Sequence, residues 1–322
     1  MRILGTAGDI TIKAPDDAYF SYFNSPYIGH SLGTAIDIYP RHQEWSGPVL
    51  SPVSGEVVKI RKMRMGKEKQ FPTEDFDYGI AILPEHATKD VVRVMHCKPT
   101  IQEGEKLELG DQIGCVIRSR YFNYWTGPHY HVEILPLDSL SRSTKSYPLD
   151  IPIGKKQYHT GNNESCMEFL ITQVSDDCAT GFSNESSYTT LGDLAGLSAE
   201  VGNSSETGII DGGLSHYPHG GVVGSKTTKE GELVHIRGQP VGRIISRRNS
   251  VSYFERGPLI MASFDGIDLR GLSCFLYPRC YTKRGIPQLI LIPREYRGFR
   301  NLIENNSVGL LEIKRLSNTN KF

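Results

Sequence analysis

Short apolar runs separated by turn residues constrain this fold more than any other feature of the sequence. The runs of the first half are bounded by residues such as Gly and Pro, and the whole chain has 33 Gly and 18 Pro in 322 residues. Short strands at even spacing are typical of a β sandwich or barrel. Long helical stretches rich in Ala, Leu, Glu and Lys are absent, so we expect a mainly β protein. The expected strands of this half are residues 33–39, 53–60, 78–83, 91–95, 115–117 and 130–135.

The length favours two domains, since one domain usually takes about 100–200 residues. The segment 136–152 is rich in Ser, Pro and Asp and is the best candidate for a linker. We therefore expect one domain at 1–145 and a second β-rich domain, of no family we recognise, at 150–322.

The second half mixes expected strands with polar sequence. We expect 175–206 to be an extended surface loop with one short helix near 191–200, and 293–304 to be a short helix with Pro near its start. The expected strands are 167–174, 234–236, 241–245, 258–264, 274–276, 288–292 and 309–313.

Charge and hydropathy limit the kinds of binding partner and the cellular location that we expect for this protein. Lys and Arg together number 36, as do Asp and Glu, so no basic field favours nucleic acid. No run reaches the ~18 apolar residues of a membrane span, and the first residues lack a signal-peptide core. We expect a cytoplasmic protein, with an extracellular location left open. The cysteines are scattered without a C-x-x-C pair, which disfavours a zinc knuckle and leaves a Cys166–Cys178 disulfide open.

The sharpest local signal for chemistry is the run PHYHVEI at 128–134. In a strand, alternate side chains share a face, so His129, His131 and Glu133 would lie side by side. Two imidazoles on one face form half of a typical zinc site. Further ligands have to come from other strands, and the segments around His30 and His96 are the candidates.

These candidate residues and several turn and strand motifs follow one another in a characteristic order along the chain. His30 and Asp37 come first, and the turn and strand SPVSGEVV follow at 51–58. His96 ends an expected strand, a Gly-rich turn occupies 104–114, and His129-Tyr130-His131 closes the series. The order resembles that of the lysostaphin-type zinc metalloendopeptidases, whose catalytic unit is the duplicated hybrid motif β fold. The resemblance covers residues 26–135, about a third of the chain.

The resemblance implies a role for each residue. His30, Asp37 and His131 would ligate Zn²⁺, and His96 and His129 would be catalytic, beside a metal-bound water. Three protein ligands would leave a fourth position for that water, whose pKa the metal lowers toward ~7. The implied activity is hydrolysis of a peptide or amide bond in a peptide or peptidoglycan-like substrate.

The step from His30 to Asp37 departs from the family pattern. It is seven residues, whereas the family usually has four. An odd step along one continuous strand would put the two side chains on opposite faces. We therefore expect a turn or bulge at Gly33, with His42 as a spare ligand if zinc is bound differently.

Other interpretations of the same residues stay open. The domain could be a non-catalytic binding or scaffold module with a residual metal site, or a zinc hydrolase of another amide or ester. Glu133 is expected to orient a ligand rather than act as a base, and Cys97 to be a buried apolar residue rather than a nucleophile. Tyr124 and Trp125 fit a groove wall and core packing equally well. The second-half loop DGGLSHYPHGG at 211–221 is a weaker candidate for a ligand site than for a turn with exposed histidines.

Overall fold

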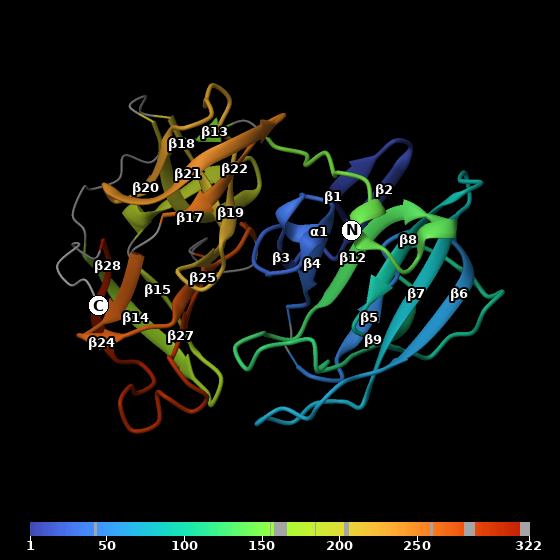
Figure 1. The fold of residues 1–322 in the computed structure, drawn as a ribbon, viewed down its shortest axis with the longest axis horizontal. Helices are drawn as coiled ribbons and strands as arrows, with labels where there is room; N and C mark the ends of the chain where they lie inside the picture. The colour runs from blue at the N-terminus through green and yellow to red at the C-terminus, as the bar shows by residue number, and fades with distance from the viewer. Residues whose placement is uncertain are drawn as a thin grey trace. The chain divides into compact units, whose positions relative to one another are not determined.

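Strands dominate the computed structural model of the chain (Figure 1), which confirms the mainly β prediction. The structure describes residues 1–41, 44–154, 156–157, 166–183, 185–202, 206–257, 260–279 and 287–315. Two compact units form. Unit 1 comprises Met1–Tyr22 and Tyr27–Pro152, and unit 2 comprises Phe23–Pro26 and Ile153–Phe322.

The main sheet of unit 1 has seven strands in the order β10-β6-β7-β8-β12-β4-β3 among the described residues. All of its neighbouring strands are antiparallel. In Figure 1, β6, β7, β8 and β12 can be followed across this sheet. Its strands are β3 (Tyr19–Ser21), β4 (Ala35–Tyr39), β6 (Gly55–Arg64), β7 (Phe76–Pro84), β8 (Asp90–Met95), β10 (Lys106–Leu107) and β12 (Tyr130–Pro136).

Smaller elements complete unit 1. A hairpin forms from β1 and β2, and a three-stranded sheet has the order β5-β11-β9. The remaining elements are β1 (Arg2–Ala7), β2 (Ile10–Ala14), α1 (Ile28–Ser31), β5 (Pro48–Leu50), β9 (Cys97–Pro99), β11 (Gln112–Val116), η1 (Leu137–Ser139) and η2 (Ser143–Lys145).

The strand β12 shows how the main sheet separates core from site. Its side chains alternate between the two faces. On one face Val132 and Ile134 are fully buried in the apolar core. On the other face His131 and Glu133 are also buried, and a buried polar face needs partners for every polar atom. The polar side chains on this face of the sheet are therefore expected to be hydrogen-bonded to one another or to neighbouring strands.

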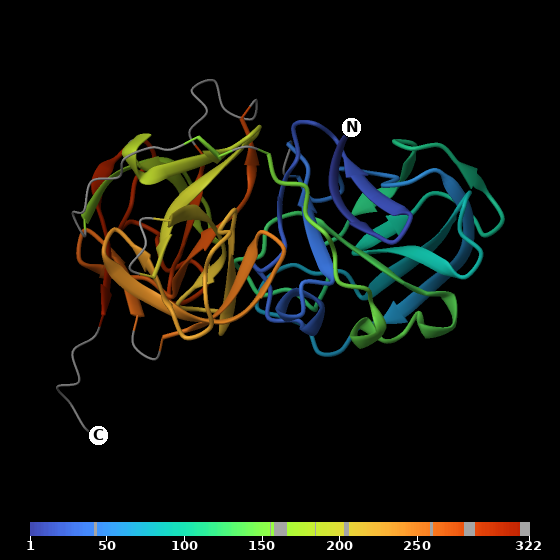
Figure 2. The ribbon, with the colours of Figure 1, turned by 90° about the horizontal axis from the view of Figure 1, so that it is seen from above.

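Unit 2 contains a closed barrel. Six strands pair in a ring, β17-β20-β21-β22-β19-β18, and β18 returns to β17. Figure 2 shows these strands, yellow to orange, from a second direction. The buried side chains inside include Val201, Ile210, Val222, Val234 and Phe254.

Beyond the barrel, the same sheet continues from β18 in the order β25-β27-β15-β14-β28-β23-β24, while β16 and β13 extend it from β17 and β26 also pairs with β17. The elements of unit 2 are β13 (Lys156–Gln157), β14 (Cys166–Val174), β15 (Ala179–Ser183), η3 (Glu185–Ser187), β16 (Tyr188–Leu191), β17 (Leu194–Val201), β18 (Glu206–Leu214), β19 (His219–Val223), β20 (Leu233–Ile236), β21 (Gln239–Arg248), β22 (Val251–Arg256), β23 (Ile260–Phe264), β24 (Ile267–Asp268), β25 (Gly271–Cys274), β26 (Tyr277–Pro278), β27 (Leu289–Ile292) and β28 (Val308–Arg315).

Two predictions for the segment 175–206 are wrong. It is not a surface loop but contains β15, β16 and β17, and the helix expected near 191–200 is the strand β17. This strand pairs with β16, β18, β20 and β26, and side chains on both of its faces, such as Leu194 and Ala195, are buried. Ala and Leu favour a helix, but the free-energy difference is below about 1 kcal/mol per residue. Strand pairing and burial therefore override this preference.

The prediction of a helix at 293–304 is also wrong, because this segment forms a series of turns and bends. Arg297 and Asn301 have positive φ angles of 68° and 60°, which a right-handed helix does not accommodate. The disulfide left open between Cys166 and Cys178 does not form. No helix in the part of the chain that the structure describes has the length and apolar character needed to cross a membrane.

Candidate metal centre

A short helix explains the unusual step from His30 to Asp37. His30 lies in α1, and the turn predicted at Gly33 is present, since Gly33 has a φ of 64°. Left-handed backbone of this kind is readily accepted by glycine. The chain then enters β4, where Asp37 lies directly opposite His131 of β12 in the strand register. The turn therefore brings a helical residue and two strand residues to one point.

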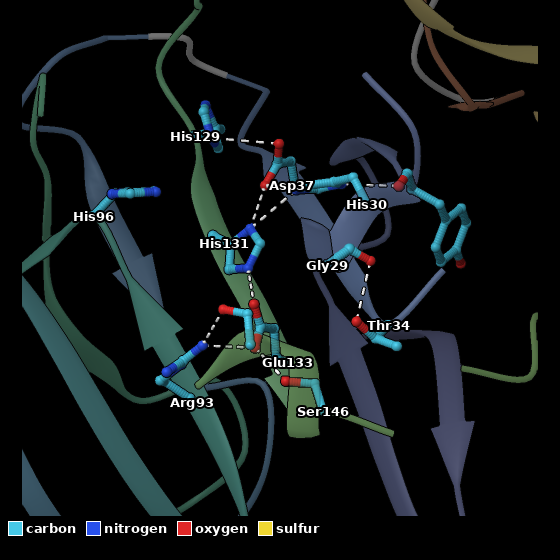
Figure 3. Close-up of polar contacts among 12 residues, drawn as sticks. Gly29, His30, Thr34, Asp37, Arg93, His96, His129, His131, Glu133 and Ser146 are labelled. Carbon is cyan, nitrogen blue, oxygen red and sulfur yellow. Dashed lines mark hydrogen bonds and ion pairs between the residues drawn. The ribbon is translucent and has the colours of Figure 1, made fainter. Parts of the chain in front are cut away.

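Three ligand-type atoms of these residues form a nearly equilateral triangle (Figure 3). His30 Nε2 lies 3.1 Å from His131 Nδ1 and 3.2 Å from Asp37 Oδ1. The third side, from His131 Nδ1 to Asp37 Oδ1, is 2.9 Å. All three residues are buried, at 0%, 2% and 7% exposure for His30, Asp37 and His131.

The outer nitrogen of each histidine fixes its tautomer. His30 Nδ1 lies 2.8 Å from the carbonyl oxygen of Tyr22, which can only accept, so this nitrogen carries the proton. His131 Nε2 likewise donates to Glu133 Oε1 at 2.6 Å. In both neutral rings the inner nitrogen is then a bare lone pair. When both rings are neutral, two nitrogen lone pairs and a carboxylate oxygen face each other, and such a group could hold a cation.

The size of the triangle fits a small divalent ion. Zinc binds histidine and carboxylate at about 2.0–2.2 Å, which gives ligand-to-ligand distances of about 3.3–3.6 Å in a tetrahedron. The observed sides are 2.9, 3.1 and 3.2 Å, so the ligands need to move outward by a few tenths of an ångström. Among the described residues, His30, Asp37 and His131 are the one group of three that could hold a metal ion.

The charges of this group reinforce each other. Burial would raise the pKa of Asp37, but His30, His129 and His131 hold it well below its ordinary value of 3.8. Burial would lower the pKa of His131, yet its bonds to Asp37 and Glu133 and their charges raise it to about 9. A proton on His131 can thus supply the positive charge that the site requires when no ion is bound.

Glu133 is held by neighbouring side chains as well as by His131. Arg93 donates to Glu133 Oε2 at 2.7 Å and Ser146 at 2.5 Å, and all of these side chains are buried. Burial would raise the pKa of Glu133, but His131 and Arg93 lower it, so the carboxylate is ionised. Glu133 therefore orients His131 and is occupied on both oxygens, in agreement with the expectation that it is not a base.

His129 lies on the other side of Asp37. Its Nε2 is 3.6 Å from Asp37 Oδ2, and its Nδ1 donates to the carbonyl oxygen of Gly127 at 2.9 Å. Burial lowers the pKa of His129 from 6.5 to about 4, so the ring is neutral at pH 7. A neutral ring that donates through Nδ1 presents the lone pair of Nε2 beside the cation site.

His96 is oriented by a residue that the sequence did not reveal. Its Nδ1 lies 2.6 Å from Asp77 Oδ2, and its backbone N–H donates to Asp77 Oδ1 at 3.2 Å. Ser119 donates to the same carboxylate at 2.6 Å, and Asp77 is fully buried. His96 has a φ of 62°, a conformation uncommon outside glycine, which the bonds to Asp77 help to hold. In Figure 3 the His96 ring points toward His129 and His131.

A cavity of about 430 Å³ opens beside these residues, and His96, His131, Glu133 and Tyr121 are among its lining. Tyr124 and Trp125 instead contact each other, with ring centroids 4.7 Å apart. Cys97 is fully buried, as expected of an apolar residue. The spare ligand His42 lies outside the described residues.

The candidate loop of unit 2 has the character of a turn. Its residues 211–214 belong to β18 and 219–221 to β19, so only 215–218 form the turn, and His216 is only partly exposed, which differs from the exposed histidine expected there. His216 Nδ1 donates to the carbonyl oxygen of Leu214 at 3.0 Å, and burial lowers the pKa of His216 to about 3.

Comparison with known proteins adds little to this geometry. Residues 11–151 match a family described as "Domain of unknown function (DUF8155) N-terminal domain". No curated protein matches the chain. Two solved structures of lysostaphin are similar at 13% identity over 60% of this chain and 86% of theirs. The antimicrobial peptidase lysostaphin from Staphylococcus simulans gives a TM-score of 0.28, and an NMR solution structure of lysostaphin gives 0.25.

Proposed function

We propose that residues 1–145 form a zinc-dependent metalloendopeptidase-like hydrolase, with 150–322 as a second domain. The proposal is carried by one observation, the convergence of two histidine lone pairs and a carboxylate oxygen within 3.2 Å of one another. The His/Asp/His set is a donor set that zinc accepts, and three protein ligands leave room for a further one. A Zn²⁺ ion held there would act as a Lewis acid on a substrate carbonyl and lower the pKa of water.

The chain's own residues supply the remaining parts of a hydrolytic site. His96, whose Nδ1 proton is held by Asp77, presents Nε2 as the atom able to take a proton from water. His129, neutral and buried, presents a second imidazole nitrogen on the other side of Asp37. The order of these residues along the chain also resembles that of the lysostaphin-type enzymes, and it supports a peptide or peptidoglycan-like substrate.

Zinc content of the full chain tests the metal site. We expect one zinc ion per chain in the wild type and its loss in His131→Ala. The matched control is His86→Ala, which removes an exposed histidine of the same unit and should keep the ion. A wild-type protein that binds no zinc at neutral pH, or a His131→Ala variant that binds it equally well, would overturn the proposal.

Hydrolysis of a fluorogenic peptide panel, which includes glycine-rich and peptidoglycan stem peptides, tests the activity. We expect His96→Ala and His129→Ala to keep zinc but to lose at least about 100-fold in rate, the usual contribution of a general acid or base. Bound zinc without hydrolysis of any amide would instead identify unit 1 as a binding module.

A further inference from the structure

The cavity lies on one face of the main sheet of unit 1, and the strand register places its lining in two rows. Partners in a register share a face of the sheet. One row runs from His131 through Met95 and Gly79 to Arg61, and Asp37 continues it beyond the cavity on the far side of His131. The neighbouring row lies two residues away on each strand and contains Glu133, Arg93, Ala81 and Lys59. The rows therefore lead from the candidate metal centre on β4 and β12 to basic side chains on β6.

The residues of the two rows on β7, which lies between the candidate metal centre and the basic side chains of β6, have small side chains or none. Gly79 has no side chain, and a Cβ built there would meet no atom within 4 Å. Ala81 occupies the equivalent place in the neighbouring row. Larger apolar side chains, Met63 and Leu140 among them, also line the cavity. The result is a trough that an extended chain can cross from the metal centre to β6.

One basic side chain of this trough has no counter-charge among the residues that the structure describes. Lys59 pairs with Glu103 at 3.1 Å, and Arg93 pairs with Glu133 at 2.7 Å. Arg61 is exposed, and its guanidinium forms no hydrogen bond or ion pair with any residue in the described ranges. An arginine guanidinium binds a carboxylate through two parallel hydrogen bonds, so it is well suited to a planar anion.

The distance between Arg61 and the candidate metal centre determines how many substrate residues fit between them. Three strand spacings separate His131 from Arg61 in the row, which corresponds to about 14 Å between backbones at ~4.8 Å per strand. The arginine side chain reaches part of the way back. An extended peptide advances ~3.3 Å per residue, so about three residues fit between the reacting amide and the guanidinium.

We propose that Arg61 is a specificity-determining residue that selects substrates with a carboxylate about three residues from the cleaved amide. This inference rests on the proposed hydrolase function and deepens it by naming the substrate class, an extended acidic peptide. The carboxylate belongs either to an Asp or Glu side chain or to the end of the peptide chain, since the guanidinium recognises the same group in both.

Peptide hydroxamates test this inference, because a hydroxamate anchors on zinc and leaves its peptide to lie along the trough. Two series carry the hydroxamate at the N-terminal or the C-terminal end of a five-residue alanine peptide, with Glu or Gln at one position in turn. A third set compares a free C-terminal carboxylate with its amide. Affinities are measured by calorimetry on the zinc-loaded full chain.

We expect Glu to bind about 10-fold more tightly than Gln at one position of one series, or the free carboxylate to show this preference over its amide. Arg61→Gln should remove the preference without changing the affinity of the Gln probe. The matched control is Lys62→Gln, which removes the same charge from the next residue, where the ammonium lies 4.0 Å from the Phe76 ring centroid. Gly79→Leu should block the trough and remove the preference while the small probe acetohydroxamate still binds.

A preference below twofold at every position, or a preference that survives Arg61→Gln, would overturn the role of Arg61. The proposed function would then still stand if acetohydroxamate binds the zinc-loaded protein. Failure of acetohydroxamate to bind, together with absence of zinc, would instead remove the proposed function, so the two failures are distinct.

Discussion

Replacement of Asp77 by asparagine changes the way His96 is held while it keeps the shape of the side chain. Oδ1 of Asp77 accepts from the backbone N–H groups of Tyr78 and His96, and an amide oxygen in this place keeps both bonds. Oδ2 accepts from His96 Nδ1 and from Ser119. An amide NH₂ cannot accept, so His96 must move its proton to Nε2 and the Ser119 hydroxyl must turn to accept.

The magnitude follows from these two bonds. A hydrogen bond to a charged group contributes about 1.5–3 kcal/mol to stability and a neutral one about 1 kcal/mol. Two bonds that change from charged to neutral should therefore lower the free energy of unfolding by about 2 kcal/mol. Asp77→Ala should cost at least ~2 kcal/mol more, because it removes the acceptor of the buried backbone N–H of His96 and of the partly buried one of Tyr78.

Urea unfolding at several pH values measures this difference. Burial would raise the pKa of Asp77, but His96 and Ser119 lower it below its ordinary value of 3.8. A carboxyl whose pKa is lower in the folded state stabilises the fold fully above the unfolded value and loses this effect as the pH falls through the folded value. The gap between wild type and Asp77→Asn should thus be full at pH 7 and shrink below about pH 3.8.

Nitrogen chemical shifts of the His96 ring report the tautomer directly. The wild type should carry its proton on Nδ1, and Asp77→Asn should carry it on Nε2, which turns the atom facing the cavity from an acceptor into a donor. Asp77→Asn should then cost hydrolytic rate while zinc content is unchanged. An unchanged tautomer, or a loss of stability below about 0.5 kcal/mol at pH 7, would refute this account of the pair.

Three further predictions concern other parts of unit 1. Glu133→Gln should weaken zinc binding by about 10–100-fold in competition with a chelator, since it removes the charge that orients His131; unchanged affinity would contradict this role. Burial raises the pKa of Cys97, so iodoacetamide at pH 8 should alkylate this thiol only after unfolding, and mass spectrometry of native protein that shows early modification would contradict its burial. Gly114→Ala should destabilise the protein by about 2 kcal/mol or more in urea unfolding, because its Cβ would lie 2.2 Å from a backbone carbonyl oxygen of β9. Gly79→Ala, which meets open space, is its control, and equal stability of the two variants would argue against this packing.

The strands of the first half were predictable because their signals are local. The runs that became β4, β8 and β12 combine β-branched residues with nearby turn residues, and both act over a few positions. The strand β17 was missed because its Ala and Leu content favours a helix, whereas two of its partners, β20 and β26, come from distant parts of the chain. Pairing between distant segments leaves no local mark on the sequence.

The residues of the candidate site also fall into those that local sequence could predict and those that depend on distant pairing. The period of a strand alone predicted one face for His129, His131 and Glu133, and β12 contains His131 and Glu133 on one face, while His129 directly precedes the strand. The carboxylate of Asp77 was missed, since its contact with His96 spans 19 residues and depends on the register of β7 and β8. Arg61 was missed for the same reason, because only the register shows that it shares a face with His131. The roles of His30, Asp37, His96, His129 and His131 in binding zinc and in catalysis stay predictions.

The helix α1 and the turn at Gly33 have a consequence for how such sites are recognised in other chains. A ligand on a helix approaches the sheet from its own direction, so its distance along the chain from the strand ligand is free to vary. The triangle of donor atoms is a property of space, and the seven-residue step shows that it need not leave a fixed spacing in the sequence. Sequence patterns keyed to a histidine and an aspartate four apart will pass over proteins built this way, whereas a search for converging donor atoms will find them.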